Sequence, residues 1–131
     1  MYRNVLIILD MKDDIDNDYV VLHKSKYIAS SLNLNVFALH VMKETNLPWE
    51  IDGIVICPSP KLSKQKIHMQ FNSISKYINM SGVSFSILVD NSVNSLKSFI
   101  EKNKIELVIM HESKTHEINM HGSQVDTIII R

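Results

Sequence analysis

Cysteine, glycine and proline are all scarce in this sequence of 131 residues, which contains one cysteine, three glycines and three prolines. The single cysteine, Cys57, excludes a disulfide framework within the chain and a zinc finger built on cysteine pairs. The sequence also lacks a P-loop, a Cys-His pair and a Ser-His-Asp order. We therefore expect a protein that is not an enzyme.

An excess of either charge is lacking too, because fourteen lysines and arginines balance fourteen aspartates and glutamates. Because the net charge is zero, we expect neither a nucleic acid nor a membrane as partner, although a local basic stripe stays open. The N-terminal apolar run, "NVLIILD", is too short for a signal peptide or a membrane span. We expect a cytoplasmic protein that folds as a single domain over residues 1–131.

What the sequence does contain is a regular alternation of apolar and amphipathic segments. Asp18 is expected to cap the first helix, and Gly82 to end the second. Residues 44–60 hold all three prolines and are expected to form an excursion with a short extended piece at residues 54–57. Strands are predicted at residues 4–10, 35–43, 83–90, 105–110 and 125–130, and helices at residues 18–33, 61–82 and 91–104.

This alternation predicts an α/β fold, with an open parallel sheet of five strands and helices on both faces. Ligands of such sheets bind beyond the carboxyl ends of the strands, near the switch in strand order. Residues that follow the strand ends are therefore the candidates for a binding site. They are Asp10, Met42, Lys43, Asp90 and His111.

Three segments carry a resemblance to a known family. "NVLIILD" is similar to a first strand that ends in aspartate, and "VFALHVMK" to a second strand of the "LLHVV" kind. "VSFSILVDNSVNSLKSFIEKNKIELVIM" is similar to a third strand, a third helix and a fourth strand that ends in "ADLIVMG". In these segments and in the order of its elements, the chain resembles the universal stress protein family. The resemblance implies a Rossmann-like sheet with strand order 3-2-1-4-5.

The nucleotide motif of that family is altered in this chain. Binding members carry "G-x-x-G" after the fourth strand and "G-S" or "G-T" about nine residues later. Here His111 and Lys114 fall on the two glycine positions, and Gly122 with Ser123 matches the closing pair after seven residues. Glycines let backbone amides approach a phosphate, whereas side chains at 111 and 114 would crowd it.

Asp10 matches the position that contacts adenine in binding members of the family. In the implied strand order, the first and fourth strands are neighbours, so Asp10 and His111 are expected to lie near each other at the carboxyl rim. From the altered motif we expect a protein that acts by binding and association in a stress response, without nucleotide hydrolysis and without a cofactor. The alternative is an ATP- or AMP-binding protein with slow ATPase activity, which would use Asp10, the backbone near Met42, Gly122 and Ser123.

A second alternative is a metal-responsive module in the segment after the fourth strand. His111, His116 and His121 alternate there with Glu112 and Glu117, and zinc or nickel takes imidazole and carboxylate ligands readily. Histidines five residues apart do not gather on a continuous helix, although a loop can bring them together. We expect a solvated connector at this place and no metal.

Several acids follow the first strand and, together with Asp90, resemble the magnesium pocket of a phosphoacceptor receiver domain. The third strand comes too late in the chain for a receiver, and no lysine follows the last strand. A cluster at the start of a helix, favoured by the helix dipole, is the expected structure. The acids are Asp10, Asp13, Asp14, Asp16 and Asp18.

The end of the chain, "VDTIII", is a short apolar strand without a lysine or proline inside it. Only fourteen residues, 111–124, separate it from the fourth strand, where the family has a long helix, so we expect one sheet face to be partly bare. Members of the family often dimerise through this strand. We predict a homodimer paired antiparallel along residues 125–130, with Val125, Ile128 and Ile130 in the interface, and expect lysines at 128 and 130 to disrupt it.

Overall fold

The five predicted strands form one parallel sheet in the computed structural model, which describes residues 2–11, 16–42, 49–56, 60–80, 82–89, 93–115, 118 and 125–131. The sheet order is β5-β2-β1-β6-β7, and all four pairs are parallel. Counted along the chain, these strands stand in the order 3-2-1-4-5, so the predicted fold class is confirmed. The strands are β1 (Asn4–Leu9), β2 (Asn35–Met42), β5 (Ser84–Val89), β6 (Leu107–His111) and β7 (Asp126–Ile130).

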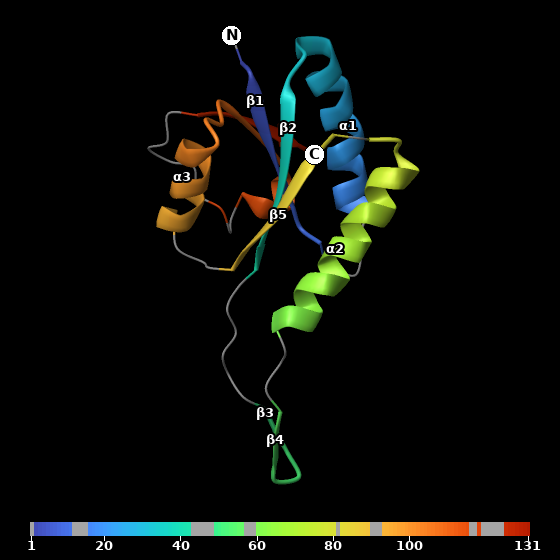
Figure 1. Ribbon diagram of the computed structural model, residues 1–131, viewed down its shortest axis with the longest axis vertical. Coiled ribbons are helices and arrows are strands. Elements are labelled where there is room, and N and C mark those ends of the chain that lie inside the picture. The colour runs from blue at the N-terminus through green and yellow to red at the C-terminus, as the bar shows by residue number, and fades with distance from the viewer. Residues whose placement is uncertain are drawn as a thin grey trace.

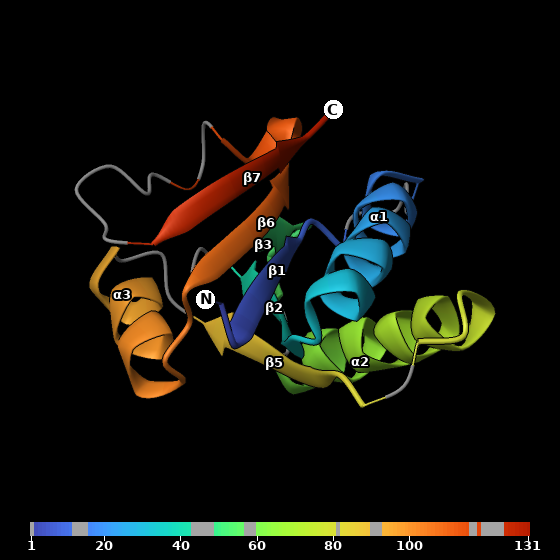
Figure 2. The same ribbon diagram turned by 90° about the horizontal axis from the view of Figure 1, so that it is seen from above.

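Helices cover both faces of the sheet, as predicted. α1 (Asp16–Leu32) and α2 (Pro60–Tyr77) lie on one face, and α3 (Val93–Lys102) lies on the other (Figure 2). The predicted Gly82 cap is wrong, because α2 ends five residues before it. Asn79 ends the helix with a left-handed φ of 55°, and the Met80 amide donates to the Ser75 carbonyl at 2.9 Å.

The continuous apolar run of β1 is explained by its central place in the sheet. Every residue from Val5 to Leu9 is at most 1% exposed. Alternate side chains point to opposite faces, so Val5, Ile7 and Leu9 join the core under α1 and α2, whereas Leu6 and Ile8 join the core under α3. A strand covered on both faces has no position at which a polar side chain is favoured.

The short crossover between β6 and β7 leaves one face of the sheet open only at its edge. A single 3-10 turn, η1 (Glu112–Lys114), is the one helical segment in the described part of this crossover. Met110 of β6 is nevertheless only 1% exposed. Its neighbour in register on β7, Ile129, is 42% exposed, so the expected bare surface is restricted to the last strand.

Residues of the excursion form a β-hairpin beyond the carboxyl end of β2, at the lower end of the view in Figure 1. β3 (Trp49–Ile51) pairs antiparallel with β4 (Ile54–Ile56). Asp52 and Gly53 connect them with φ of 51° and 80°, as two-residue hairpin turns require. The extended piece predicted at residues 54–57 is therefore one strand of a hairpin. Within the described helices, none combines the length and the apolar character that crossing a membrane would take.

Candidate functional site

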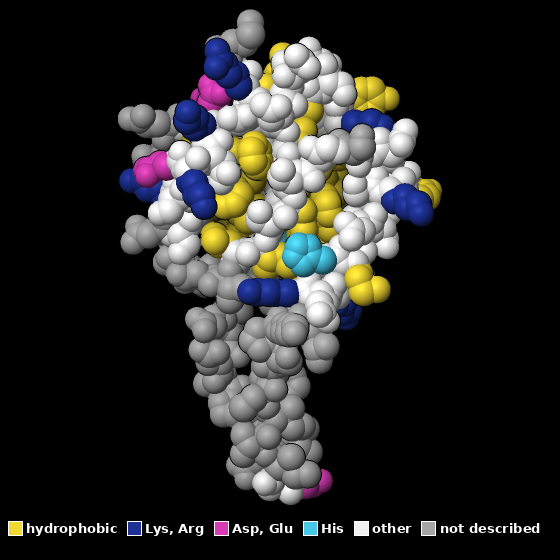
Figure 3. All heavy atoms as spheres, viewed as in Figure 1, with side chains coloured by type: hydrophobic (Ala, Val, Ile, Leu, Met, Phe, Trp, Pro, Cys, Tyr) yellow, Lys and Arg dark blue, Asp and Glu magenta, His cyan; other side chains and the backbone are white. Residues whose placement is uncertain are grey.

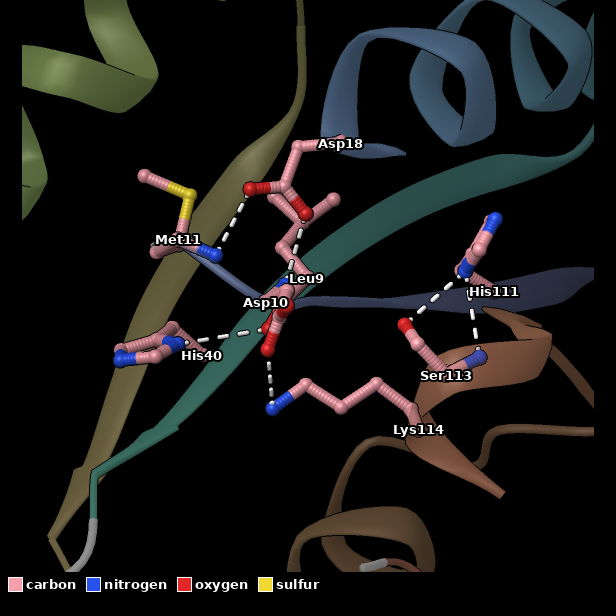
Figure 4. A network of polar contacts seen from close by, with 8 residues as sticks. All are labelled: Leu9, Asp10, Met11, Asp18, His40, His111, Ser113 and Lys114. Atoms are coloured by element: carbon pink, nitrogen blue, oxygen red, sulfur yellow. Dashed lines mark hydrogen bonds and ion pairs between the residues drawn. The ribbon is translucent and has the colours of Figure 1, made fainter. Parts of the chain in front are cut away.

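The chain leaves β1 through a turn that is held by a buried carboxylate. Asp18 is 2% exposed, and its two oxygens accept the backbone N–H groups of Asp10 and Met11, each at 2.7 Å (Figure 4). Met11 has a left-handed φ of 52°, a conformation that few residues with a side chain adopt. Asp18 is therefore a clamp on the end of β1 and not the predicted cap, since its oxygens bind the strand exit and α1 begins two residues earlier.

The environment of Asp18 pulls its protonation in two directions. Burial raises the pKa of the Asp18 carboxyl above its ordinary value. The two N–H groups that it accepts favour the ionised form and lower the pKa, but to a smaller extent. The negative charge of Asp10 raises the pKa of Asp18 further, because the two buried carboxyl groups lie close to each other.

A buried ion pair closes the rim beside this clamp. The Lys114 ammonium lies 2.7 Å from an Asp10 carboxylate oxygen, and the two residues are 6% and 7% exposed. β1 and β6 are hydrogen-bonded neighbours, and η1 turns the chain back at the end of β6, so the Lys114 side chain points across the rim to Asp10 (Figure 4). A charge-assisted contact of this length offsets part of the cost of burying both charges.

His40 forms a third side of the site from β2. It is paired in register with Leu9, and its Nδ1 lies 3.3 Å from the Leu9 carbonyl oxygen. Burial lowers the pKa of the imidazole, and the Lys114 charge lowers it further, whereas the Leu9 carbonyl and Asp10 act in the opposite direction. His40 is 9% exposed, and its lowered pKa favours the neutral form of the ring.

His111 lies at the same rim as Asp10, as the predicted strand order required, but it has a different partner. Its Nδ1 accepts the Ser113 backbone N–H at 3.1 Å and lies 2.9 Å from the Ser113 hydroxyl, so the ring caps η1 (Figure 4). Asp10 therefore pairs with Lys114, three residues after His111, and not with His111 itself. From the sequence, Lys114 was expected only to crowd a phosphate, and its ion pair with Asp10 was not predicted.

The remaining candidate residues contribute less. Met42 is the last residue of β2 and lies at the carboxyl end of the sheet, but its side chain is not described. Within the described ranges, no group of three or more histidine, cysteine, aspartate or glutamate side chains is arranged to hold a metal. The other predicted positions lie outside the described residues: Lys43, Asp90, His116, Glu117, His121, Gly122 and Ser123, and, among the acids, Asp13 and Asp14.

Two members of the site, His40 and the clamping role of Asp18, were missed by sequence reasoning. The signal for His40 was present, because it is the one ionisable residue within the apolar strand "VFALHVM". Asp18 was hidden among neighbouring acids, and nothing local distinguishes a carboxylate that binds its own helix from one that binds a distant strand end. Together these residues form a compact polar network in which the ammonium of Lys114 already occupies the carboxylate of Asp10.

Comparison with known proteins places the fold. No protein-family model matches this sequence, and no curated protein matches it either. Among solved structures, a universal stress protein in complex with cAMP matches with a TM-score of 0.65 and 14% identity, over 99% of this chain and 97% of that chain. A universal stress protein from Archaeoglobus fulgidus in complex with dAMP matches with a TM-score of 0.66 and 14% identity, over 99% and 98%.

A third structure, of a universal stress protein family member from Burkholderia pseudomallei, matches with a TM-score of 0.65 and 10% identity, over 98% and 96% of the two chains. At such low identity the likeness concerns the backbone and extends over nearly the whole of each chain. It agrees with the strand order, the parallel sheet and the helices on both faces described above. The chain has the fold of the universal stress proteins.

Proposed function

We propose that this protein acts by binding and association, in the manner of a universal stress protein whose nucleotide site is closed by its own side chain, and that it is not an enzyme. The buried Asp10–Lys114 ion pair carries the proposal. Asp10 corresponds to the position that contacts adenine in nucleotide-binding members, and Lys114 to a glycine of their phosphate motif. A nucleotide base that used Asp10 would first have to separate two buried opposite charges.

Equilibrium dialysis with radiolabelled ATP and AMP, in the presence of magnesium, tests the proposal directly. We expect no saturable binding at nucleotide concentrations up to about 1 mM, which corresponds to a binding free energy weaker than about −4 kcal/mol. Micromolar binding at one site per chain would overturn the closed site. ATPase activity that co-elutes with the protein in gel filtration, with phosphate released at a rate proportional to protein concentration, would overturn the absence of catalysis.

A pair of variants separates closure of the site from loss of the motif. Lys114→Gly removes the ion pair and opens the space that the side chain fills, whereas Lys114→Met removes the ion pair and keeps that space filled. If the lysine closes the site, AMP binding strengthens at least about tenfold in the glycine variant and not in the methionine variant, a difference of about 1.4 kcal/mol. Equal strengthening in both variants would assign the block to the ion pair and not to the filled space, and no strengthening in either would mean that Lys114 does not block the site. Circular dichroism confirms folding first.

The second candidate function is nucleotide binding with slow ATP hydrolysis. One observation favours it, because two of the similar structures are described as complexes with cAMP and dAMP. In this chain, nucleotide binding would require Asp10 to release Lys114 and to contact the nucleotide instead. The dialysis experiment decides between the two candidates, since only the second predicts micromolar binding by the unaltered protein.

Association through β7 is the other half of the proposal. The Asp126 N–H donates to the Glu106 carbonyl at 3.3 Å, so the backbone of Asp126 faces β6, and alternation turns the backbone groups of Thr127 and Ile129 to the free edge. An edge with unpaired N–H and C=O groups favours pairing with another strand. We expect a homodimer in which two β7 strands, with Val125 beside them, pair antiparallel across a two-fold axis.

A further inference from the structure

Although the whole chain has zero net charge, most of the helix layer formed by α1 and α2 is cationic. Residues 19–32 of α1 and 60–77 of α2 contain six lysines and no acid, so the rest of the chain holds eight lysines and arginines against all fourteen acids. Acidic side chains in Figure 3 lie on the α3 side and at the hairpin tip, and none lies over α2. The six lysines are Lys24, Lys26, Lys61, Lys64, Lys66 and Lys76.

A row of four rings crosses this cationic helix layer. Tyr19, His23 and Tyr27 follow one another at intervals of four residues along one side of α1, and Tyr77 approaches the row from the end of α2. Successive ring centroids are 5.5 Å (Tyr77 to Tyr19), 6.0 Å (Tyr19 to His23) and 5.6 Å (His23 to Tyr27) apart. We call these four residues the aromatic row.

Packing of the core accounts for Tyr19, which is partly buried against it, but not for the three exposed rings of the aromatic row. α1 buries Val21, Leu22 and Ala29 against the sheet, on its other side. The two end rings, Tyr27 and Tyr77, are 69% and 78% exposed. Each of these tyrosine rings contacts a further ring of the row, Tyr77 against Tyr19 and Tyr27 against His23, and together they form a surface that offers flat apolar faces to a partner.

Lysines lie beside the aromatic row at both ends. Lys26 donates through its ammonium to the Ile78 carbonyl at 3.0 Å, which ties α1 to the chain after α2 and fixes one positive charge between the helices. Lys24 and Lys76 are exposed and lie within three residues of Tyr27 and Tyr77 along their helices. The nearest acid on α1 that is exposed, Asp16, belongs to its first turn.

We infer that the aromatic row and its lysines bind single-stranded nucleic acid, with bases stacked on the exposed rings and phosphates held by ammonium groups. An acidic peptide would use the lysines but would leave the rings without a partner. A lipid surface would require a broad apolar face, whereas serine, asparagine and glutamine alternate with the lysines on α2. This inference is independent of the Asp10 site and of the β7 edge, because it uses neither.

Fluorescence anisotropy with labelled 20-nucleotide single strands, one of RNA and one of DNA, tests the inference on the whole chain. At 50 mM salt we expect a dissociation constant on the order of 10 µM for at least one of them, and a loss of about tenfold or more at 200 mM salt as counterions are released. Absence of binding at 100 µM protein and low salt would overturn it. So would tighter binding to phosphatidylserine vesicles or to a 20-residue polyglutamate than to either strand.

Three double variants at exposed positions locate the surface. We expect Tyr27→Ala with Tyr77→Ala, and Lys24→Glu with Lys76→Glu, each to weaken binding at least tenfold. The matched control is Lys97→Glu with Lys102→Glu on α3, which reverses the same number of charges on the other face and should change binding less than threefold. An unchanged affinity of the tyrosine variant would exclude stacking, and an equal loss in the α3 control would exclude a localised site; either result overturns the inference.

Discussion

Among single side chains, those of the Asp10–Lys114 contact are expected to have the largest effect on the free energy of unfolding. Lys114→Met leaves the Asp10 carboxylate buried without its ammonium partner. We expect the free energy of unfolding to fall by about 3–5 kcal/mol, since an uncompensated buried charge is strongly destabilising. Urea denaturation followed by circular dichroism measures the change.

A double-mutant cycle shows whether the loss comes from the pair. Asp10→Asn combined with Lys114→Met removes both charges, so most of the lost stability should return. Lys97→Met, at an exposed position on α3, serves as control and should change stability by less than about 0.5 kcal/mol. If the double variant is as unstable as the two single changes added together, the two side chains do not interact in solution.

The second residue-scale prediction concerns pH and His40. The folded pKa of His40 is depressed below its ordinary value of 6.5, so its contribution to stability is complete above that value and is lost as pH falls through the folded pKa. Below both pKa values, the stability contributed by His40 is gone. Between the ordinary pKa of 6.5 and the lower folded pKa, the free energy of unfolding should drop by up to about 1.4 kcal/mol for each unit by which the pH falls.

Urea denaturation of the unaltered protein and of His40→Asn at pH 7.5, 6.5 and 5.5 measures this dependence. Asparagine keeps a donor near the Leu9 carbonyl and does not titrate, so the variant should lose less stability over this range. Asp18 acts with the opposite sign, because its raised pKa makes its contribution complete only below 3.8 and lost at higher pH. If the free energy of unfolding of His40→Asn falls with pH as steeply as that of the unaltered protein, the pH dependence belongs to other groups.

At the scale of the elements, β7 decides whether the molecule associates. The structure corrects the substitutions that the sequence favoured, because Ile130 is 6% exposed and Ile128 is half-buried against the core under α1. A lysine at 130 is therefore expected to destabilise the monomer itself. Ile129, which is 42% exposed and turns its backbone to the free edge, is the position that tests pairing alone.

We predict that Ile129→Lys converts a dimer into a folded monomer, because it places a charge in the paired edge without entering the core. Light scattering at about 50 µM protein measures the mass, a concentration suited to dimers with micromolar affinity. Leu32→Lys is the control, since Leu32 is an exposed apolar residue at the end of α1 and should leave the dimer intact. A monomer already present in the unaltered protein at this concentration would remove the prediction.

At the scale of the whole molecule, stability is expected to be graded outward from the centre of the sheet. β1 is paired on both sides and buried on both faces, and β6 is paired on both sides and buried from Leu107 to Met110. In the monomeric Ile129→Lys variant, hydrogen exchange followed by mass spectrometry should therefore find the slowest amides in these two strands, and faster ones in the edge strands β5 and β7. In the unaltered protein, β7 should exchange more slowly than in this variant, because the dimer covers its free edge.

The sequence by itself determined the architecture. Its apolar runs alternate with segments of helical period, and such a pattern can bury its apolar surface only by placing helices over a parallel sheet. It also placed Asp10 and His111 at one rim, because both follow the ends of strands. Local patterns of this kind depend on residues near one another in the chain, and those can be recognised without knowing the fold.

Only the tertiary structure decided which side chains meet. Lys114 and Asp10 are separated by about a hundred residues, and their contact depends on the pairing of β1 with β6 and on the direction of η1. Asp18 binds the end of β1 only because α1 folds back onto that strand. The aromatic row likewise requires the end of α2 to lie beside α1. Contacts between distant segments are set by the packing of whole elements, so no local pattern in the sequence specifies them.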